Sequence, residues 1–299
     1  MNKLVIVLGM LSLWPSSAAL AQLEVPNEAG VRFAQWGTIV TDVDATKRFW
    51  TILGGQAIKI DGMDVIKFPG VYIFLKKGHP TGGSFGSAVN HLGFFVPDDK
   101  AAVEKWNAQG ATAEYAHSVF VSSSLGWAYT PDNVKVEINA DKNLTIPIAN
   151  PHVHIWVADS ARPDVSAWYA KMFGGKLVRG KEGVLRLEGL PGVRLYTANA
   201  QDPRGFTPRS VGLINGKLPA EESPIIKNLV NPPTPTKGRS LDHIGFEVRN
   251  LEAFCKKLEA NGMKFDSPYS KTRHHSFANA ELTDPWGVSI ELTEGLGRF

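Results

Sequence analysis

Cysteine is almost absent from this chain, because Cys255 is the only one among its 299 residues. A single cysteine cannot form an internal disulfide, which excludes the class of small scaffolds held together by disulfide bridges. Cys255 lies in the amphipathic stretch LEAFCKKLEANG, beside Phe254 and near Leu258. This setting predicts a small residue of the hydrophobic core rather than a reactive nucleophile.

An excess of charge of one sign is also lacking, since the chain has 32 basic and 29 acidic residues. Such a balance favours neither nucleic acid nor a membrane surface as a partner. The apolar run at residues 4–14 is too short to span a bilayer. Followed by Ala19 and Ala21, it is typical of a secretory signal peptide that is cut after Ala21. We therefore expect residues 1–21 to be removed and the protein to be exported to the bacterial periplasm.

What the chain does contain is one pattern that occurs four times. Each copy opens with a strand-like segment that has a valine five residues after its first residue; the opening residues are Gln35, His91, His152 and His243. A helix-capping residue follows two positions after the valine, and these caps are Asp42, Asp98, Asp159 and Asn250. The helical stretch then ends near a glycine, and short strands complete the unit. The sequence predicts four strand-helix units, which we number one to four.

The four units predict two domains. With 43% hydrophobic residues, a chain of this length can bury two cores. Unit one resembles unit three, as in FPGVYIF and LPGVRLY, which indicates a duplicated two-unit domain. We predict an N-terminal domain at residues 22–145 and a C-terminal domain at residues 146–299. Residues 199–240 are far longer than an ordinary connection and are predicted to form a lid or a disordered insert.

The alternation of side chains along the strands predicts which face carries the polar residues. In HIGFEV, Ile244 and Phe246 face the helix, so His243 points to the opposite face of the sheet. The same alternation sends the late-strand carboxylates to that face. One histidine alone is more often a hydrogen-bonded structural residue, but the recurrence across units predicts a metal site. The predicted ligands are His152, His243 and Glu291, a set that suits Fe(II), Mn(II) or Zn(II). The corresponding N-terminal set is Gln35, His91 and Glu137, in which glutamine is the poorer ligand.

At these residues the chain resembles the vicinal oxygen chelate superfamily, which includes glyoxalases, bleomycin-resistance proteins and ring-cleaving dioxygenases. The resemblance rests on the His-x4-Val-x-Asp openings and on the DP-x-G-x3-E closing at residues 284–291, and it covers nearly all of the chain after residue 21. It implies an α+β fold of four βαβββ units paired into two half-barrel domains. It also implies one divalent metal that binds two adjacent oxygens of a small organic substrate. A complete His-His-Glu set in the second domain alone is similar to extradiol catechol dioxygenases, which use Fe(II).

The residues before Glu291 leave three functions open. Thr272-x-His274 matches the histidine that these dioxygenases keep near the bound oxygen, which favours an oxygenase with His274 as a catalytic residue. Glu281, preceded by Ala280, stands where that family has a tyrosine, so an isomerase or lyase with Glu281 as its acid or base is an alternative. A third is a non-catalytic protein that binds a small molecule. The sequence leaves the substrate, the metal and the oligomeric state undetermined.

Overall fold

The computed structural model describes residues 23–117, 124–157, 159–179, 185–190, 192–197, 233–271 and 276–299. The predicted signal peptide and most of the predicted insert lie outside these ranges, so the proposals made for them stay predictions. Among the helices that are described, none has the length and apolar character needed to cross a membrane.

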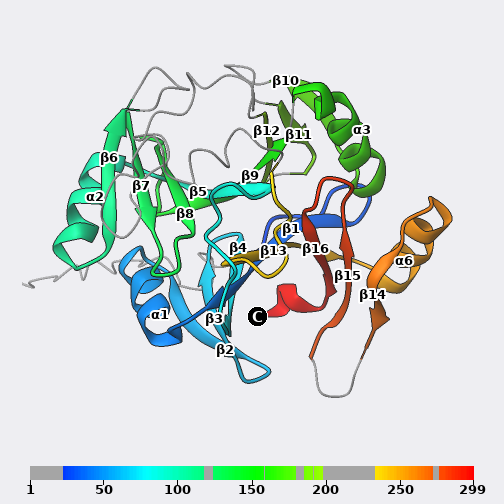
Figure 1. The fold of residues 1–299 in the computed structure, drawn as a ribbon, viewed down its shortest axis with the longest axis horizontal. Helices are drawn as coiled ribbons and strands as arrows, with labels where there is room; N and C mark the ends of the chain where they lie inside the picture. Colours follow the sequence, from blue (N-terminus) through cyan, green and yellow to red (C-terminus); the bar gives the residue numbers. More distant parts are fainter. Residues whose placement is uncertain are drawn as a thin grey trace, which may run out of the picture.

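Each of the four units folds as a βαβββ unit, with the helices at the periphery of the molecule and the strands inside (Figure 1). Unit one contains β1 (Val31–Val40), α1 (Val43–Ile52), β2 (Gln56–Ile60), β3 (Met63–Phe68) and β4 (Val71–Lys77). Unit two contains β5 (Val89–Val96), α2 (Asp99–Ala108), β6 (Thr112–His117), β7 (Ser124–Tyr129) and β8 (Lys135–Ala140). Unit three contains β9 (Ala149–Val157), the 3-10 turn η2 (Asp159–Ala161), α3 (Arg162–Phe173), β10 (Lys176–Arg179), β11 (Leu185–Glu188) and β12 (Val193–Thr197). Unit four contains β13 (Leu241–Val248), α6 (Leu251–Ala260), β14 (Phe265–Ser270), β15 (Ala278–Thr283) and β16 (Ser289–Glu294), and the 3-10 turn η5 (Leu296–Arg298) follows it. The predicted α+β class is therefore confirmed.

Three of the four predicted helix caps are confirmed. The side chains of Asp42, Asp98 and Asn250 each accept a hydrogen bond from the backbone N–H three residues later. Asp159 is not the cap of α3, because it begins the turn η2 and the helix starts only at Arg162. Ala161 precedes the helix and has no side-chain oxygen to offer, while Pro163 fits the first helical turn because its missing N–H would have no intrahelical partner.

The strands form two eight-stranded sheets, and each sheet joins two units that are not the predicted pair. The first sheet has the order β14-β15-β16-β13-β1-β4-β3-β2, and the second has the order β10-β11-β12-β9-β5-β8-β7-β6. Units one and four share the first sheet through the antiparallel pair β1 and β13. Units two and three share the second through β5 and β9. Each sheet thus contains strands from both sides of the predicted division at residue 145. The sequence did not predict this pairing, because the opening strands have similar patterns and no local feature selects their partners.

The two sheets pack against each other through the faces that the alternation assigned to the core. Phe94 on β5 is fully buried, and its ring lies 5.2 Å from that of Trp36 on β1 and 4.8 Å from that of Phe68 on β3. These distances are measured between ring centroids and are typical of packed aromatic pairs. One hydrophobic cluster therefore extends across both sheets. The polar residues of the opening strands lie on the opposite, concave faces.

Part of the concave face of the first sheet is filled by the turn η5, and the C-terminus lies inside that curve (Figure 1). Leu296 is buried against Ala34 and Tyr72. The buried carboxylate of Glu247 on β13 accepts hydrogen bonds from the backbone N–H groups of residues 295, 296 and 297. These bonds satisfy backbone donors of the turn that would otherwise lack partners.

Candidate functional sites on the two sheets

The structure does not bring the three predicted metal ligands together. His243 on β13 and Glu291 on β16 lie in the first sheet, with 3.2 Å between Nε2 of His243 and Oε2 of Glu291. His152 on β9 lies in the second sheet, where its Nε2 is 3.2 Å from Oε2 of Glu137. The predicted grouping of His152 with His243 and Glu291 assumed that units three and four share a sheet, which they do not. Each sheet instead has its own cluster of polar side chains.

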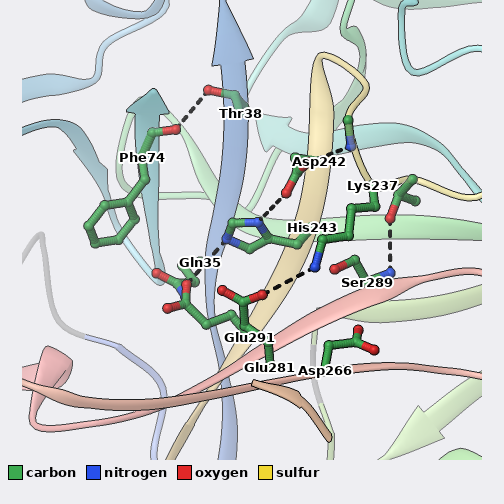
Figure 2. A network of polar contacts seen from close by, with 12 residues as sticks. Gln35, Thr38, Phe74, Lys237, Asp242, His243, Asp266, Glu281, Ser289 and Glu291 are labelled. Atoms are coloured by element: carbon green, nitrogen blue, oxygen red, sulfur yellow. Dashed lines mark hydrogen bonds and ion pairs between the residues drawn. The ribbon is translucent and has the colours of Figure 1, made fainter. Parts of the chain in front are cut away.

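The first cluster, which we call the His243 cluster, consists of Gln35, Asp242, His243 and Glu291 (Figure 2). Gln35 on β1 donates a hydrogen bond of 2.5 Å from Nε2 to Oε2 of Glu291. Nδ1 of His243 is 2.9 Å from Oδ2 of Asp242. Burial lowers the pKa of His243, but the hydrogen bonds with Asp242 and Glu291 outweigh it and raise this pKa to about 10. The imidazole of His243 is therefore held between two carboxylates.

A cavity of about 590 Å³, which we call the first-sheet cavity, opens beside the His243 cluster. Glu281 on β15 lines it, and this carboxylate forms an ion pair of 3.3 Å with Lys237 (Figure 2). Phe74 and Phe277 form an apolar wall, with their ring centroids 6.2 Å apart. Phe74 on β4 stands where Glu291 stands in unit four, so unit one contributes an aromatic ring in place of a second carboxylate. The predicted residue Glu281 thus lies in the same cavity as two of the predicted ligands.

The second cluster, which we call the His91 cluster, consists of His91 on β5, Glu137 on β8, and His152 and His154 on β9. One donor atom from each of His91, Glu137 and His154 lies within 4.8 Å of the other two, and all three residues are buried. Nε2 of His154 is 3.4 Å from the same Glu137 oxygen that His152 contacts. Burial raises the pKa of Glu137, but the positive charge of His154 and the hydrogen bond from His152 outweigh it and hold this pKa well below its usual range. Glu137 is therefore ionised.

Neighbouring polar groups orient the side chains of the His91 cluster. Nδ1 of His91 is 2.9 Å from Oδ1 of Asn90, and Nδ1 of His152 is 3.0 Å from the backbone oxygen of Asn150. Asn139 donates a hydrogen bond of 2.8 Å to Oε2 of Glu137. Partners of this kind fix the ring orientation of histidines that bind metals, and they would leave Nε2 of His91 and His152 as the nitrogen that could bind an ion.

The pairing of opening strands explains why the two clusters differ. Three opening residues face a glycine on the neighbouring unit, and these pairs are Gln35 with Gly245, His243 with Gly37, and His152 with Gly93. A Cβ atom at Gly37 would overlap the ring of His243, so glycine lets that ring cross the partner strand. In unit three, the position that corresponds to these glycines is occupied by His154, which lies opposite His91. The rings of His91 and His154 are in contact there, with their centroids 4.1 Å apart and their planes tilted by 32°. A histidine in a place occupied by glycine in the other three units is a sequence signal that our reasoning did not use.

Lys135 on β8 also lies beside the His91 cluster, and sequence reasoning did not single it out. Its side chain is buried, and Nζ lies 3.8 Å from the ring centroid of Trp127. The ring of Trp127 in turn contacts that of His91 edge-on, with 5.3 Å between centroids. Burial lowers the pKa of Lys135 to about 7, against the opposing effect of Glu114 and Glu137.

A comparison with known families matches the second half of the chain. Residues 151–292 match the model of the Glyoxalase/Bleomycin resistance protein/Dioxygenase superfamily. This part of the chain belongs to the superfamily. The superfamily is the one that the sequence resemblance indicated, so that prediction is confirmed.

Two solved structures show the superfamily fold over most of the chain. Glyoxalase I from Zea mays superposes with a TM-score of 0.62 and 15% sequence identity, covering 90% of this chain and 94% of the maize chain. A putative dioxygenase from Bacillus subtilis subsp. subtilis str. 168 gives a TM-score of 0.55 with 13% identity, covering 92% and 86% of the two chains. At these identities the likeness extends to the fold alone. No curated protein matches this chain.

The His91 cluster fits the divalent metal implied by the superfamily resemblance. Two imidazoles and one ionised carboxylate, with donor atoms that lie within 4.8 Å of one another, are a set of ligand types that suits Fe(II), Mn(II) or Zn(II). The ligands project from three adjacent strands, β8, β5 and β9, so the backbone holds them without a flexible loop. The catalytic residue predicted for the oxygenase, His274, lies outside the described residues, as does His275.

Proposed function

We propose that this chain is a divalent-metal-dependent enzyme that binds a small organic substrate through two adjacent oxygen atoms. The observation that carries the proposal is the convergence of His91, Glu137 and His154, whose donor atoms lie within 4.8 Å of one another in a buried site. A bound divalent ion would supply Lewis-acid polarisation of a substrate oxygen. His152 contacts the same Glu137 oxygen and would either steady this carboxylate or add a fourth donor.

The proposal predicts one divalent ion per chain. Protein stripped with a chelator and then dialysed against Mn(II) or Zn(II) should retain one equivalent by elemental analysis, because three protein donors of this type hold such ions tightly. Addition of the ion should also raise the melting temperature, since a ligand that binds only the folded state stabilises it. A stripped protein that takes up no ion and shows no thermal shift contradicts the metal-dependent function.

A second candidate is an isomerase or lyase reaction in the first-sheet cavity. The observation that favours it is the presence of Glu281 in a cavity that also contains His243 and Glu291. A carboxylate at the wall of a cavity can take a proton from a carbon next to a carbonyl group. This candidate contrasts with the oxygenase implied by the resemblance to extradiol dioxygenases, which depends on His274.

Glu281→Gln tests the second candidate, because glutamine keeps the size of the side chain and removes its ability to accept a proton. We expect turnover to fall about 100-fold, the usual scale for a lost acid or base. The assay uses catechols and α-hydroxy carbonyl compounds, each with and without O2. The matched control is Lys237→Met, which removes the ion-pair partner and leaves the carboxylate.

The pattern of outcomes separates the functions. Turnover without O2 that depends on Glu281 supports proton transfer. Strict dependence on O2, with full activity in the Glu281→Gln variant, contradicts it and supports the oxygenase. Tight binding of a compound without conversion supports the third alternative, a small-molecule binding protein.

A further inference from the structure

Lys135 occupies a defined position beside the His91 cluster. In the parallel pair of β5 and β8, Leu92 aligns with Val136 and Gly93 aligns with Glu137. His91 precedes Leu92 and Lys135 precedes Val136. His91 and Lys135 therefore lie at neighbouring positions on the two strands. Lys135 also lies two residues before Glu137, and side chains two apart on a strand share a face. The lysine therefore projects from the same concave face as the cluster.

The amine of Lys135 is held in place by aromatic rings. Nζ lies 3.8 Å from the centroid of Trp127 and 5.8 Å from that of Phe85, and the residue is 4% exposed. The loop that carries Phe85 is fixed in turn by Arg239, whose Nη2 donates a hydrogen bond of 3.1 Å to the Phe85 backbone oxygen. An ammonium group on an aromatic face is attracted by the ring, and its long apolar stem packs well in a wall. The geometry fixes one amine at the edge of the His91 cluster.

The equivalent position in the first sheet carries no charge. Glu291 on β16 corresponds to Glu137 on β8, so the counterpart of Lys135 is Ser289, which is also buried. Folding alone is therefore compatible with a small neutral residue at this place in the repeat. Burial of a lysine carries a desolvation cost, which an apolar residue of similar length would avoid. The lysine thus distinguishes the chemistry of the second site from that of the first.

We propose that Lys135 binds an anionic oxygen of the substrate and that the His91 cluster selects small organic acids. The substrate class is a carboxylate with a second oxygen on the neighbouring carbon, as in 2-oxo and 2-hydroxy acids. This inference rests on the proposed function, because the ion at His91, Glu137 and His154 would hold one oxygen while Lys135 holds the negative charge. A bound ion and the protonated amine of Lys135 would each attract the negative charge of such a substrate.

The experiment compares an anionic and a neutral probe on the Mn(II)-loaded protein. Oxalate and its uncharged diamide, oxamide, each present two adjacent oxygens, and calorimetry measures the dissociation constant of each. Lys135→Met keeps the length of the side chain and removes its charge. We expect this variant to bind oxalate about 10- to 100-fold more weakly, the usual effect of losing a hydrogen bond to a charged group, with oxamide binding and Mn(II) content unchanged. Lys142→Met, which changes an exposed lysine shortly after β8, is the matched control and should bind oxalate like the wild type.

The outcomes keep this inference separate from the proposed function. Equal oxalate affinity in the wild type and in Lys135→Met, both holding Mn(II), overturns the role of Lys135 and leaves the metal site intact. The same conclusion follows if the wild type does not prefer oxalate to oxamide. A wild type that binds no Mn(II) contradicts the proposed function itself. If Lys135→Met does not fold, Lys135→Arg replaces it, because that variant keeps the charge and should keep the preference for oxalate.

Discussion

Replacing Glu137 with alanine should lower the affinity for a divalent metal by about 100-fold or more, because it removes the carboxylate from a site with two or three imidazole donors. Glu137 is the acidic member of the His91 cluster, and His152, His154 and Asn139 all contact its Oε2. The loss of the carboxylate also leaves these partners without their shared acceptor. Elemental analysis after dialysis against Mn(II) measures the effect as bound ion per chain.

Glu291→Ala is the matched control for this prediction. Glu291 stands at the same place in the first sheet, 3.2 Å from a histidine and within hydrogen-bond distance of Asn279. We expect this variant to retain the ion, because the His243 cluster offers one imidazole, one carboxylate and a glutamine amide. The opposite result, with the ion kept in Glu137→Ala and lost in Glu291→Ala, would assign the metal to the His243 cluster.

Phe94→Ala should lower the free energy of unfolding by about 3 to 5 kcal/mol, the range measured when a buried aromatic ring is truncated to alanine. Phe94 is fully buried and packs against Trp36, Trp50 and Phe68. These partners belong to unit one, whereas Phe94 belongs to unit two, so the cavity would open at the contact between the two sheets. Denaturant unfolding followed by tryptophan fluorescence measures the change.

Phe95→Ala serves as the control for Phe94, since the next side chain along β5 points to the other face. Phe95 is partly exposed, and its ring centroid lies 5.6 Å from that of His152. We expect a loss of stability of about 1 to 2 kcal/mol, because less apolar area leaves water in the folded state. Equal losses for the two variants would mean that the contact between the sheets adds little to stability.

The local parts of the fold could be predicted from the sequence because their causes are local. A side chain such as Asp42 or Asn250 caps the helix that follows it, whatever the rest of the chain does. The alternation in HIGFEV likewise fixes the face of His243 without reference to any partner strand. The pairing of strands has no such local cause. β1 could satisfy its hydrogen bonds beside several strands of similar pattern, and its pairing with β13 depends on the packing of the whole molecule.

For the site, too, the local features could be predicted and the strand pairing could not. The residue types and their face followed from the repeat, and His91 and Glu137 were recognised as corresponding to a metal set. Which residues meet could not be predicted, since His152 joins Glu137 only when β9 pairs with β5. Lys135 escaped attention because a lysine in a strand is normally exposed, and its burial under Trp127 is a property of the assembled sheet.

The order in which the chain is synthesised affects the two clusters differently. Every member of the His91 cluster lies between residues 91 and 154, on strands of two consecutive units, so the ribosome supplies all of them well before the chain is finished. The His243 cluster combines Gln35, made near the start, with Glu291, made near the end. Closing so long a loop is a slow step in folding, and β1 has an unpaired edge until β13 emerges. The second sheet can thus fold during translation, whereas the first can fold only after the complete chain has been synthesised.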